Sequence, residues 1–281
     1  MIHIERFAPS PTGRLHLGHA FSALMAHDRA LAAGGRFLLR MEDLDTSRVK
    51  PAYVAGIEED LAWLGLAWQR PVLFQSARLA SYDTALDLLS ARGLTYACRC
   101  TRREIQDAIA APQEGGPDGS VYPGTCRYAG HPAGPGTALR LDMSKALDAI
   151  GDDLASLHFV ETGEETEARH SIREVDLART AGDIVLRRRD GAVAYHLAVV
   201  VDDAHQGITH VTRGEDLLPA TPIHRVLQEL LGLPAPVYRH HRLIRDQAGK
   251  RLAKRQDALS LQTLREEGIT PAQIRERLSL L

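Results

Sequence analysis

The sequence predicts an α/β protein whose parallel, doubly wound sheet carries an inserted module. Stretches typical of strands and of helices alternate through about the first hundred residues, which indicates a parallel sheet covered on both faces. A segment rich in Pro and Gly, residues 111–136, interrupts this pattern, and the alternation returns after it. We therefore expect one core formed by two separated halves, with the module between them.

The predicted strands are residues 2–7, 36–41, 138–141, 183–189, 192–196 and 208–212. Residues 183–196 are expected to form a hairpin, because the dipeptide Asp190-Gly191 fits a type I′ turn. Gly34 and Gly93 are expected to end two helices, since glycine readily adopts the left-handed conformation at a C-cap. Prolines in a first turn and side chains that cap helices set the predicted helix starts, which lie near Leu17, Pro51, Ser76, Thr221, Gln262 and Pro271.

The composition is that of an ordinary globular protein of 281 residues. The 34 Lys and Arg against 36 Asp and Glu give a formal charge of −2, which excludes a protein that holds nucleic acid by bulk charge alone. The longest apolar run, residues 197–201, is far shorter than the roughly 18 residues that a membrane span needs. Three cysteines are too few for a disulfide framework. We expect a cytoplasmic protein that does not bind a membrane.

The strongest local motif, Ala-Pro-Ser-Pro-Thr-Gly-Arg-Leu-His-Leu-Gly-His, occupies residues 8–19 between the first strand and the first helix. A helix start in this position binds phosphate, because backbone amides and the positive end of the helix dipole face the ligand. His16 and His19 can donate to phosphoryl oxygens, and Gly18 allows a nucleoside to approach the backbone. By itself, the His-x-x-His pair favours a simpler interpretation, in which two histidines cap a helix.

A second motif, the basic loop of residues 249–255, changes this interpretation. The loop can close over a triphosphate and stabilise the charge that develops as pyrophosphate leaves, although alone it favours a solvated turn. Together the motifs resemble the two signatures of class I aminoacyl-tRNA synthetases, which implies a Rossmann-like catalytic core. Further blocks are similar to the glutamyl branch of that family: residues 6–13, 39–45, 200–203, 207–218 and 221–222.

The resemblance implies that eight residues bind L-glutamate: Arg6, Phe7, Ala8, Pro9, Ser10, Glu42, Tyr195 and Arg213. A substrate with two carboxylates and one ammonium requires arginine forks and a carboxylate. Arg6 and Arg213 can supply the forks and Glu42 can take the ammonium, but which arginine meets which carboxylate stays open. Without the resemblance, Glu42 would be interpreted as part of a helix cap, and Tyr195 as a core aromatic of a strand.

The resemblance also implies ATP bound with Mg²⁺ at His16, Gly18, His19 and Lys254. His16, His19 and Lys254 are expected to be catalytic, because they stabilise charge on the phosphates. The loop departs from the usual family pattern at Arg251 and Ala253, where lysine and serine are typical.

The cysteines, Cys98, Cys100 and Cys126, lie in or next to the Pro/Gly-rich segment. Thiolates gathered there suit one structural zinc ion, which can order a segment that lacks its own core. Spacing alone would nominate His131 as the fourth ligand, whereas the resemblance implies Tyr122. A metal-free set of thiols is the alternative, since Cys-x-Cys alone is a weak signal.

Few residues follow Ala258, too few for the anticodon-binding domain of an ordinary glutamyl-tRNA synthetase. The chain therefore resembles the short glutamyl-Q branch. This resemblance implies activation of glutamate to glutamyl-adenylate and transfer of the glutamyl group to queuosine at the wobble position of tRNA(Asp). We expect a monomer with a helical C-terminal part. The expected segments are residues 1–97 and 181–258 for the core, 98–180 for the zinc module and 259–281 for the tail.

Three alternatives stay open at this point. The first is a truncated enzyme that charges the 3′ end of tRNA(Glu), and the second is a non-catalytic paralogue that binds RNA. The third is another adenylate-forming nucleotidyltransferase, which the blocks at residues 39–45 and 207–218 disfavour. Basic residues that are candidates for tRNA contacts, or for a solvated surface, are Arg187, Arg188, Arg189, Arg239, His240, His241 and Arg242.

Overall fold

The computed structural model describes residues 2–101, 103–105, 121–163, 166–173, 175–244 and 260–280. The chain divides into two compact units. The first unit comprises residues 1–77, 207–218 and 237–281, and the second comprises residues 78–206 and 219–236. Both units are therefore assembled from segments that are far apart in the sequence.

The strands are β1 (Ile4–Phe7), β2 (Arg36–Met41), β3 (Gln69–Phe74), β4 (Thr95–Cys98), β5 (Ala138–Leu141), β6 (His158–Thr162), β7 (Glu167–Ser171), β8 (Val185–Arg187), β9 (His210–Gly214) and β10 (Val237–His241). The α-helices are α1 (Leu17–Ala32), α2 (Pro51–Trp63), α3 (Leu79–Ala91), α5 (Met143–Ile150), α6 (Leu177–Thr180), α7 (Tyr195–His205), α8 (Thr221–Leu231), α9 (Leu261–Glu266) and α10 (Pro271–Arg277). Short 3₁₀ helices are η1 (Gln75–Arg78), η2 (Gly151–Ala155) and η3 (Glu215–Ala220).

A parallel sheet organises the first unit. β2 pairs in parallel with β1 and β3, and β9 pairs in parallel with β10. β9 lies beside β1, where the Thr209 amide donates to the Ile4 carbonyl at 3.0 Å and the Ile4 amide donates to the Thr209 hydroxyl at 2.8 Å. The three-stranded sheet β3-β2-β1 therefore lies beside the parallel pair β9 and β10, and these two hydrogen bonds join them. The predicted parallel sheet, with its halves far apart in the sequence, is confirmed.

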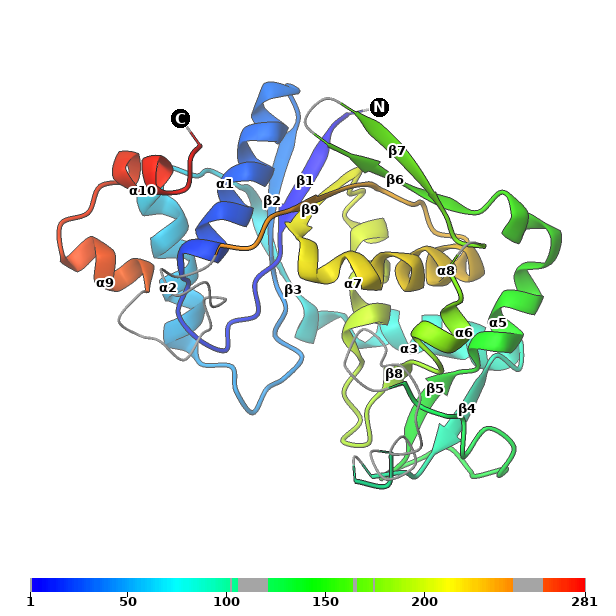
Figure 1. The fold of residues 1–281 in the computed structure, drawn as a ribbon. Coiled ribbons are helices and arrows are strands. Elements are labelled where there is room, and N and C mark those ends of the chain that lie inside the picture. The colour runs from blue at the N-terminus through cyan, green and yellow to red at the C-terminus, as the bar shows by residue number, and fades with distance from the viewer. Residues whose placement is uncertain are drawn as a thin grey trace. The chain divides into compact units, whose positions relative to one another are not determined.

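Helix α1 lies along β1 and β2 (Figure 1). Small side chains let its backbone approach the sheet, since four of its alanines are fully buried: Ala20, Ala23, Ala26 and Ala30. Gly34 ends the helix with φ +61°, as predicted. A Cβ on Gly35 would lie 2.0 Å from the carbonyl oxygen of His3, so only glycine fits where the chain turns back into β2.

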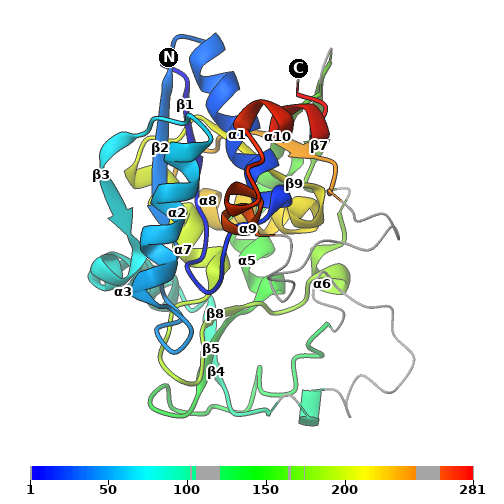
Figure 2. The same ribbon diagram turned by 90° about the vertical axis from the view of Figure 1, so that its left-hand side faces the viewer.

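The C-terminal helices belong to the first unit. α10 lies beside α1 and α9 beside α2 (Figure 2). Arg275 donates to both carboxylate oxygens of Asp28 at 2.6 and 3.0 Å, which fixes α10 to α1. The predicted start of α10 is confirmed, because the Thr270 hydroxyl accepts the Gln273 amide in a capping box.

The second unit contains an antiparallel sheet and several packed helices. β5 lies between β4 and β8, and β6 pairs with β7. The fully buried carboxylate of Asp202 on α7 accepts hydrogen bonds from Arg78 at 2.6 Å and from Tyr82 at 2.7 Å. These bonds anchor α7 to α3, and α7 in turn packs against α8.

The predicted cap at Ser76 is wrong. The Ser76 amide and hydroxyl donate to the Asp43 carboxylate at 2.8 and 2.5 Å. α3 begins only at Leu79, and its N-cap Arg78 makes no side-chain capping bond. The hydroxyl is thus used by a buried carboxylate that lies far away in the sequence.

The predicted hairpin at residues 183–196 is only partly confirmed. Gly191 turns with φ +89°, and a single bridge joins Arg187 to Val193. Tyr195 then starts α7 instead of continuing a strand. The apolar residues that follow, residues 197–200, are consecutive and all buried in the second unit, as in a helix that is packed on most of its sides.

None of the helices within the described ranges is both long and apolar enough to cross a membrane. The apolar run noted in the sequence, residues 197–201, lies inside α7.

A buried acid makes the stability of the first unit depend on pH. Asp60 on α2 is 2% exposed, and burial raises its pKa from 3.8 to about 6 although Arg265 lies 3.7 Å away. The folded protein thus binds this proton more tightly than the unfolded chain does, and the resulting stabilisation is lost as the pH rises from about 4 to about 6. Asp60→Asn should therefore raise the free energy of unfolding by about 1–2 kcal/mol at pH 8.

Chemical denaturation between pH 4 and pH 8 measures this effect. The gain from Asp60→Asn should shrink as the pH falls. Asp87→Asn on the exposed surface of α3 is the control, and it should change stability little at any pH. A gain from Asp60→Asn that is constant across this range would contradict the prediction.

Candidate functional site

Two histidines form the start of α1, at the end of the loop that follows β1. The His16 side chain accepts the Gly18 amide at 3.1 Å, and His19 Nδ1 accepts the His16 amide at 3.1 Å. The two rings lie 3.8 Å apart between centroids. Since each Nδ1 accepts a backbone hydrogen, each neutral ring carries its proton on Nε2, as a donor suited to a phosphoryl oxygen. Helix capping and ligand binding are therefore compatible in this pair.

Gly18 is held tightly against this cap. A Cβ on Gly18 would lie 3.1 Å from Cε1 and 3.2 Å from Nδ1 of His16. Such contacts are closer than carbon atoms normally approach, so a side chain at this position would displace the His16 ring.

The chain returns to this cap near its C-terminal end. Ser260 forms an isolated antiparallel bridge with His16, and the Leu261 amide donates to the Leu15 carbonyl at 2.9 Å. Ser260 is buried. Lys254 and the rest of the basic loop lie outside the described residues, which resume at Ser260.

Glu42 follows β2 directly and lies next to the loop after β1. Its amide donates to the Pro9 carbonyl at 3.0 Å, and its carboxylate lies 3.4 Å from the Arg40 guanidinium. α2 begins only at Pro51, with Lys50 at its N-cap, so Glu42 does not cap that helix. Its carboxylate is largely buried at the carboxyl end of a parallel strand, where ligands bind in such sheets.

The predicted arginine forks lie on neighbouring strands of the first unit. Arg6 belongs to β1 and Arg213 to β9, and each is 5% exposed. Arg213 Nε donates to His240 Nε2 at 3.0 Å, and Nη2 donates to the Leu217 carbonyl at 3.3 Å. The structure thus brings Arg6, Arg213 and Glu42 to the carboxyl ends of β1, β9 and β2.

The segment from Arg6 to Ser10 leads out of β1 into the loop that precedes α1. Phe7 and Pro9 are buried, while Ala8 and Ser10 are partly exposed. Residues 5–7 of the strand are all buried, so partly exposed side chains appear only after the strand ends, next to Glu42, whose amide donates to Pro9.

Tyr195 lies in the second unit, as the first residue of α7. Its ring contacts His196 and His224 edge-on, with centroids 5.6 and 5.5 Å away. His196 Nδ1 and His224 Nε2 lie 3.1 Å apart, within hydrogen-bond distance. The role of Tyr195 toward glutamate stays a prediction.

Three thiols gather in the second unit. Cys98 ends β4, and the sulfur atoms of Cys98, Cys100 and Cys126 all lie within 4.8 Å of one another. The Tyr122 hydroxyl lies 3.4 Å from Cys98 Sγ and 3.5 Å from Cys100 Sγ. It also accepts the Cys126 amide at 2.8 Å. The metal-ligating side chains grouped there in the described ranges do not include His131.

The spacing of this group suits a tetrahedral metal ion. With Zn–S distances near 2.3 Å, thiolates at two corners of a tetrahedron lie roughly 3.8 Å apart, and Cys100 Sγ and Cys126 Sγ are 3.5 Å apart. Burial raises the pKa of Tyr122, and its hydrogen bonds with the thiols raise it further. Burial also raises the pKa of Cys100, to about 11. The pKa of Cys126 falls to about 6, because bonds from Tyr122 and the Arg99 amide outweigh its burial.

Salt bridges and stacking hold this group in place. The Arg140 guanidinium lies 3.8 Å from the centroid of the Tyr122 ring. Arg127 follows Cys126 and pairs with the buried Asp183 at 2.8 Å, and Tyr96 donates to the same carboxylate at 2.5 Å. Asp183 is thus the anchor of the cysteine group. The sequence does not predict this role, because a single aspartate in a strand-like stretch carries no distinctive signal.

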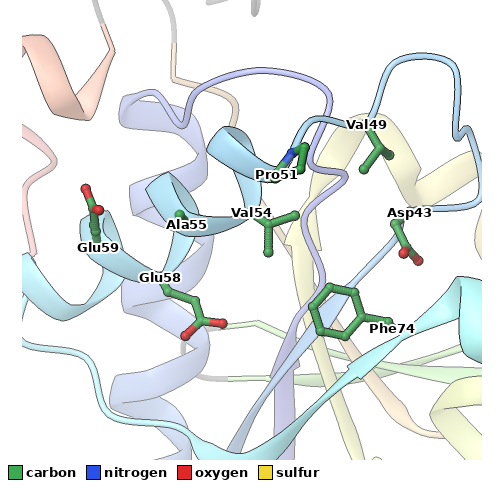
Figure 3. Close-up of a pocket in the computed structure, with 8 residues that line it drawn as sticks. All are labelled: Asp43, Val49, Pro51, Val54, Ala55, Glu58, Glu59 and Phe74. Carbon is green, nitrogen blue, oxygen red and sulfur yellow. The ribbon is translucent and has the colours of Figure 1, made fainter.

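An open pocket of about 610 Å³ lies in the first unit, between the loop before α2, α2 itself and the end of β3 (Figure 3). Its walls are mostly apolar, and the acids at its rim already have partners. Glu58 pairs with Arg70 at 2.6 Å, and Asp43 accepts from Ser76. The lining residues are Asp43, Val49, Pro51, Val54, Ala55, Glu58, Glu59 and Phe74.

Two of the residues that were candidates for tRNA contacts make hydrogen bonds within the first unit. His241 is 7% exposed, and its Nε2 lies 2.6 Å from the Ser22 hydroxyl. Burial lowers the pKa of His241, which keeps its ring neutral near pH 7. His240 accepts from Arg213. Both rings thus support the fold around α1 and β9.

Comparison with known proteins places these features in one family. The sequence matches the family described as tRNA synthetases class I (E and Q), catalytic domain, over residues 3–281. It is 57% identical to the glutamyl-Q tRNA(Asp) synthetase of Rhodobacter capsulatus, over 99% of this chain and 100% of that protein. The protein of the same name from Nocardia farcinica is 44% identical, over 96% of this chain and 81% of that protein.

A solved structure gives the same result for the fold. The glutamate-tRNA synthetase of Elizabethkingia anophelis is similar over 91% of this chain, with a TM-score of 0.67 and 27% sequence identity. The chain spans about half of that enzyme, 53% of its length.

The cysteine group predicts a bound metal ion. Purified protein should contain about one tetrahedrally bound ion per chain, because the three thiols and the phenol leave room for one. Cys98→Ser should abolish stoichiometric binding, as measured by elemental analysis after dialysis. Tyr122→Phe keeps the ring and should retain the ion with lower affinity against a chelator. Full retention by Cys98→Ser would refute the assignment.

Proposed function

The chain belongs to the class I tRNA synthetases (E and Q), and we propose that it activates glutamate with ATP and transfers the glutamyl group to queuosine at the wobble position of tRNA(Asp). One observation carries this proposal: the relative from Rhodobacter capsulatus, named glutamyl-Q tRNA(Asp) synthetase, matches along its whole length at 57% identity. Further relatives of the same name match more than nine tenths of the chain.

In the first step, a carboxylate oxygen of glutamate attacks the α-phosphorus of ATP. The bond from this phosphorus to the bridging oxygen breaks, and pyrophosphate leaves. The protein positions the reactants and stabilises the developing charge. His16 and His19 suit this role, because their Nε2–H groups are donors at the positive end of α1. Mg²⁺ bound with ATP supplies further positive charge.

Lys254 is proposed to contact the phosphates from the basic loop. Support comes from the return of the chain at Ser260, which pairs with His16. Lys254 lies six positions before Ser260, and six extended residues reach about 20 Å. A connection of this length is enough for a lysine ammonium to reach a nucleotide bound at the start of α1, which supports the proposed contact.

The glutamate is proposed to bind Arg6, Arg213, Glu42 and the segment that ends at Ser10, as the resemblance implies. Two buried guanidinium groups and a carboxylate on neighbouring strands match the two carboxylates and the ammonium of glutamate. Tyr195 keeps its assignment to the same substrate on the resemblance alone.

The metal ion is proposed to be one structural zinc, held by Cys98, Cys100, Tyr122 and Cys126. Its ligand set of sulfur and phenol oxygen fits zinc better than a harder cation such as Mg²⁺. The ion would cross-link the end of β4 to the Pro/Gly-rich segment, which has few apolar residues of its own.

The second step transfers the glutamyl group from the adenylate to queuosine and releases AMP. The names of the relatives favour this step over charging of tRNA(Glu). The presence of His16, His19, Glu42 and Arg213 together disfavours a non-catalytic RNA-binding paralogue.

Transfer of labelled glutamate tests the proposed function. Label should appear on tRNA(Asp) that contains queuosine, and neither on an unmodified transcript of tRNA(Asp) nor on tRNA(Glu), because the acceptor is the modified base. Label on tRNA(Glu) would identify a charging enzyme, and no label on any tRNA despite adenylate formation would refute the transfer step.

The contact of Gly18 with His16 predicts a selective loss of activity. Gly18→Ala should slow glutamate-dependent ATP–pyrophosphate exchange about tenfold, because the new Cβ displaces the His16 ring from its cap. Gly56→Ala in α2 is the matched control, since a Cβ there meets nothing within 4 Å.

Measuring the ATP–pyrophosphate exchange rate and the thermal unfolding of both variants tests whether the position of the His16 ring matters for the reaction. Gly56→Ala should keep full activity and gain about 0.5–1 kcal/mol of stability. Equal activity of Gly18→Ala and the wild type would show that the position of the His16 ring does not matter for the reaction.

A further inference from the structure

We propose that His240 and Tyr238 on β10 are positioning residues for Arg213, and that they fix its guanidinium group to receive a carboxylate of glutamate. The inference rests on the proposed function, because it takes Arg213 as a substrate-binding residue. It assigns to His240 a role in amino-acid recognition, in place of the tRNA contact for which the sequence made it a candidate.

The register of the sheet brings these side chains together. His240 on β10 is the direct partner of Arg213 on β9. Tyr238 lies two positions before His240, and residues two apart on a strand share one face of the sheet. The rings of Tyr238 and His240 are nearly parallel, with an interplanar angle of 6° and centroids 5.9 Å apart. Both rings therefore face Arg213 from one strand.

Three contacts restrain the guanidinium group. Nε donates to His240 Nε2 at 3.0 Å, and Nη2 donates to the Leu217 carbonyl at 3.3 Å. The guanidinium carbon lies 5.1 Å from the centroid of the Tyr238 ring, within the range of a cation–π contact. One contact is made at Nε, one at Nη2 and one on the face of the group. Together they fix the position and the plane of the guanidinium group.

The chemistry of the His240 contact is specific. Arginine has no acceptor, so His240 must accept at Nε2 and carry its proton on Nδ1. A protonated ring would present a donor and a positive charge to the guanidinium, and this would break the contact. His240 is therefore a neutral acceptor, and this role requires an acceptor at the position of Nε2.

A restrained guanidinium group binds its ligand with a smaller loss of side-chain entropy. Arginine has many rotamers, and immobilising one such side chain on binding weakens affinity by roughly three- to tenfold. A carboxylate that binds an arginine through two parallel bonds also requires a set plane. Arg213 is 5% exposed, so the cost of ordering it is met during folding.

Variants at His240 separate positioning from a general effect on folding. His240→Leu removes the acceptor, whereas His240→Gln keeps an acceptor oxygen at a similar reach. The KM for glutamate in ATP–pyrophosphate exchange should rise about tenfold in His240→Leu and stay within about threefold of wild type in His240→Gln. The kcat and the KM for ATP should change less than about threefold in both. His205→Leu on the exposed end of α7 is the control.

Tyr238 gives an independent pair of variants. Tyr238→Phe keeps the ring over the guanidinium group and should leave the KM for glutamate unchanged. Tyr238→Leu removes the ring and should raise this KM about threefold. If Tyr238→Phe and Tyr238→Leu raised the KM for glutamate equally, the hydroxyl and not the ring would be required, and this would contradict the stacking role.

A double-mutant cycle identifies the residue through which His240 acts. If His240 works only by holding Arg213, His240→Leu should raise the KM for glutamate no further in an Arg213→Ala background. Additive effects of the two changes would overturn the inference. If His240→Leu raised the KM values for glutamate and ATP equally and lowered the melting temperature, the effect would be a general one on folding, and the inference would also be overturned. A change confined to the KM for tRNA would also overturn it, and would restore the RNA contact.

Failure of the premise gives a different result. Wild-type protein without glutamate-dependent exchange would overturn the proposed function itself. Exchange that is unaffected by Arg213→Ala would leave the function intact but remove Arg213 from the glutamate site, and the inference with it. An effect of Arg213→Ala without an effect of His240→Leu would overturn the inference alone.

Discussion

The hydrogen bonds between Ile4 and Thr209 are the interaction on which the first unit depends. They join the three-stranded sheet at the start of the chain to the parallel pair β9 and β10, about two hundred residues later. The groups of this unit that are proposed to bind glutamate lie at or just after the carboxyl ends of β1, β2 and β9. The hydrogen bonds between Ile4 and Thr209 hold β1 next to β9. Arg6 and Arg213 become neighbours only because β1 and β9 do.

The second unit contains a segment that hydrophobic packing alone does not stabilise. The Pro/Gly-rich segment has too few apolar side chains to bury a core, so ordering it requires another source of free energy. Three thiols and a phenol lie close enough together to hold a metal ion, and Asp183 holds the arginine that follows Cys126. A metal ion held there would, together with this buried ion pair, stabilise the segment in place of hydrophobic packing. All three cysteines of the chain lie in or next to the segment.

Local signals in the sequence were sufficient where no distant group competes for them. Gly34, Pro51 and Thr270 end or begin helices as predicted, because their effects act on the adjacent backbone. Ser76 failed as a cap because the distant Asp43 accepts its hydroxyl. The contact of His240 with Arg213 could not be predicted from local sequence either, because it follows from the register of two strands. Motifs nominate the candidate residues, but pairing between strands determines which side chains contact them.

Histidine is an unusual cap for α1, and the proposed phosphate site gives a physical reason for it. Serine, aspartate and asparagine are better N-caps than histidine, and an acidic cap would also interact favourably with the helix dipole. An aspartate at the position of His16, however, would place a negative charge where a triphosphate is proposed to bind. Two neutral histidines satisfy the first amides of the helix through Nδ1 and present donors at Nε2. The weaker cap therefore keeps the start of α1 able to accept an anion.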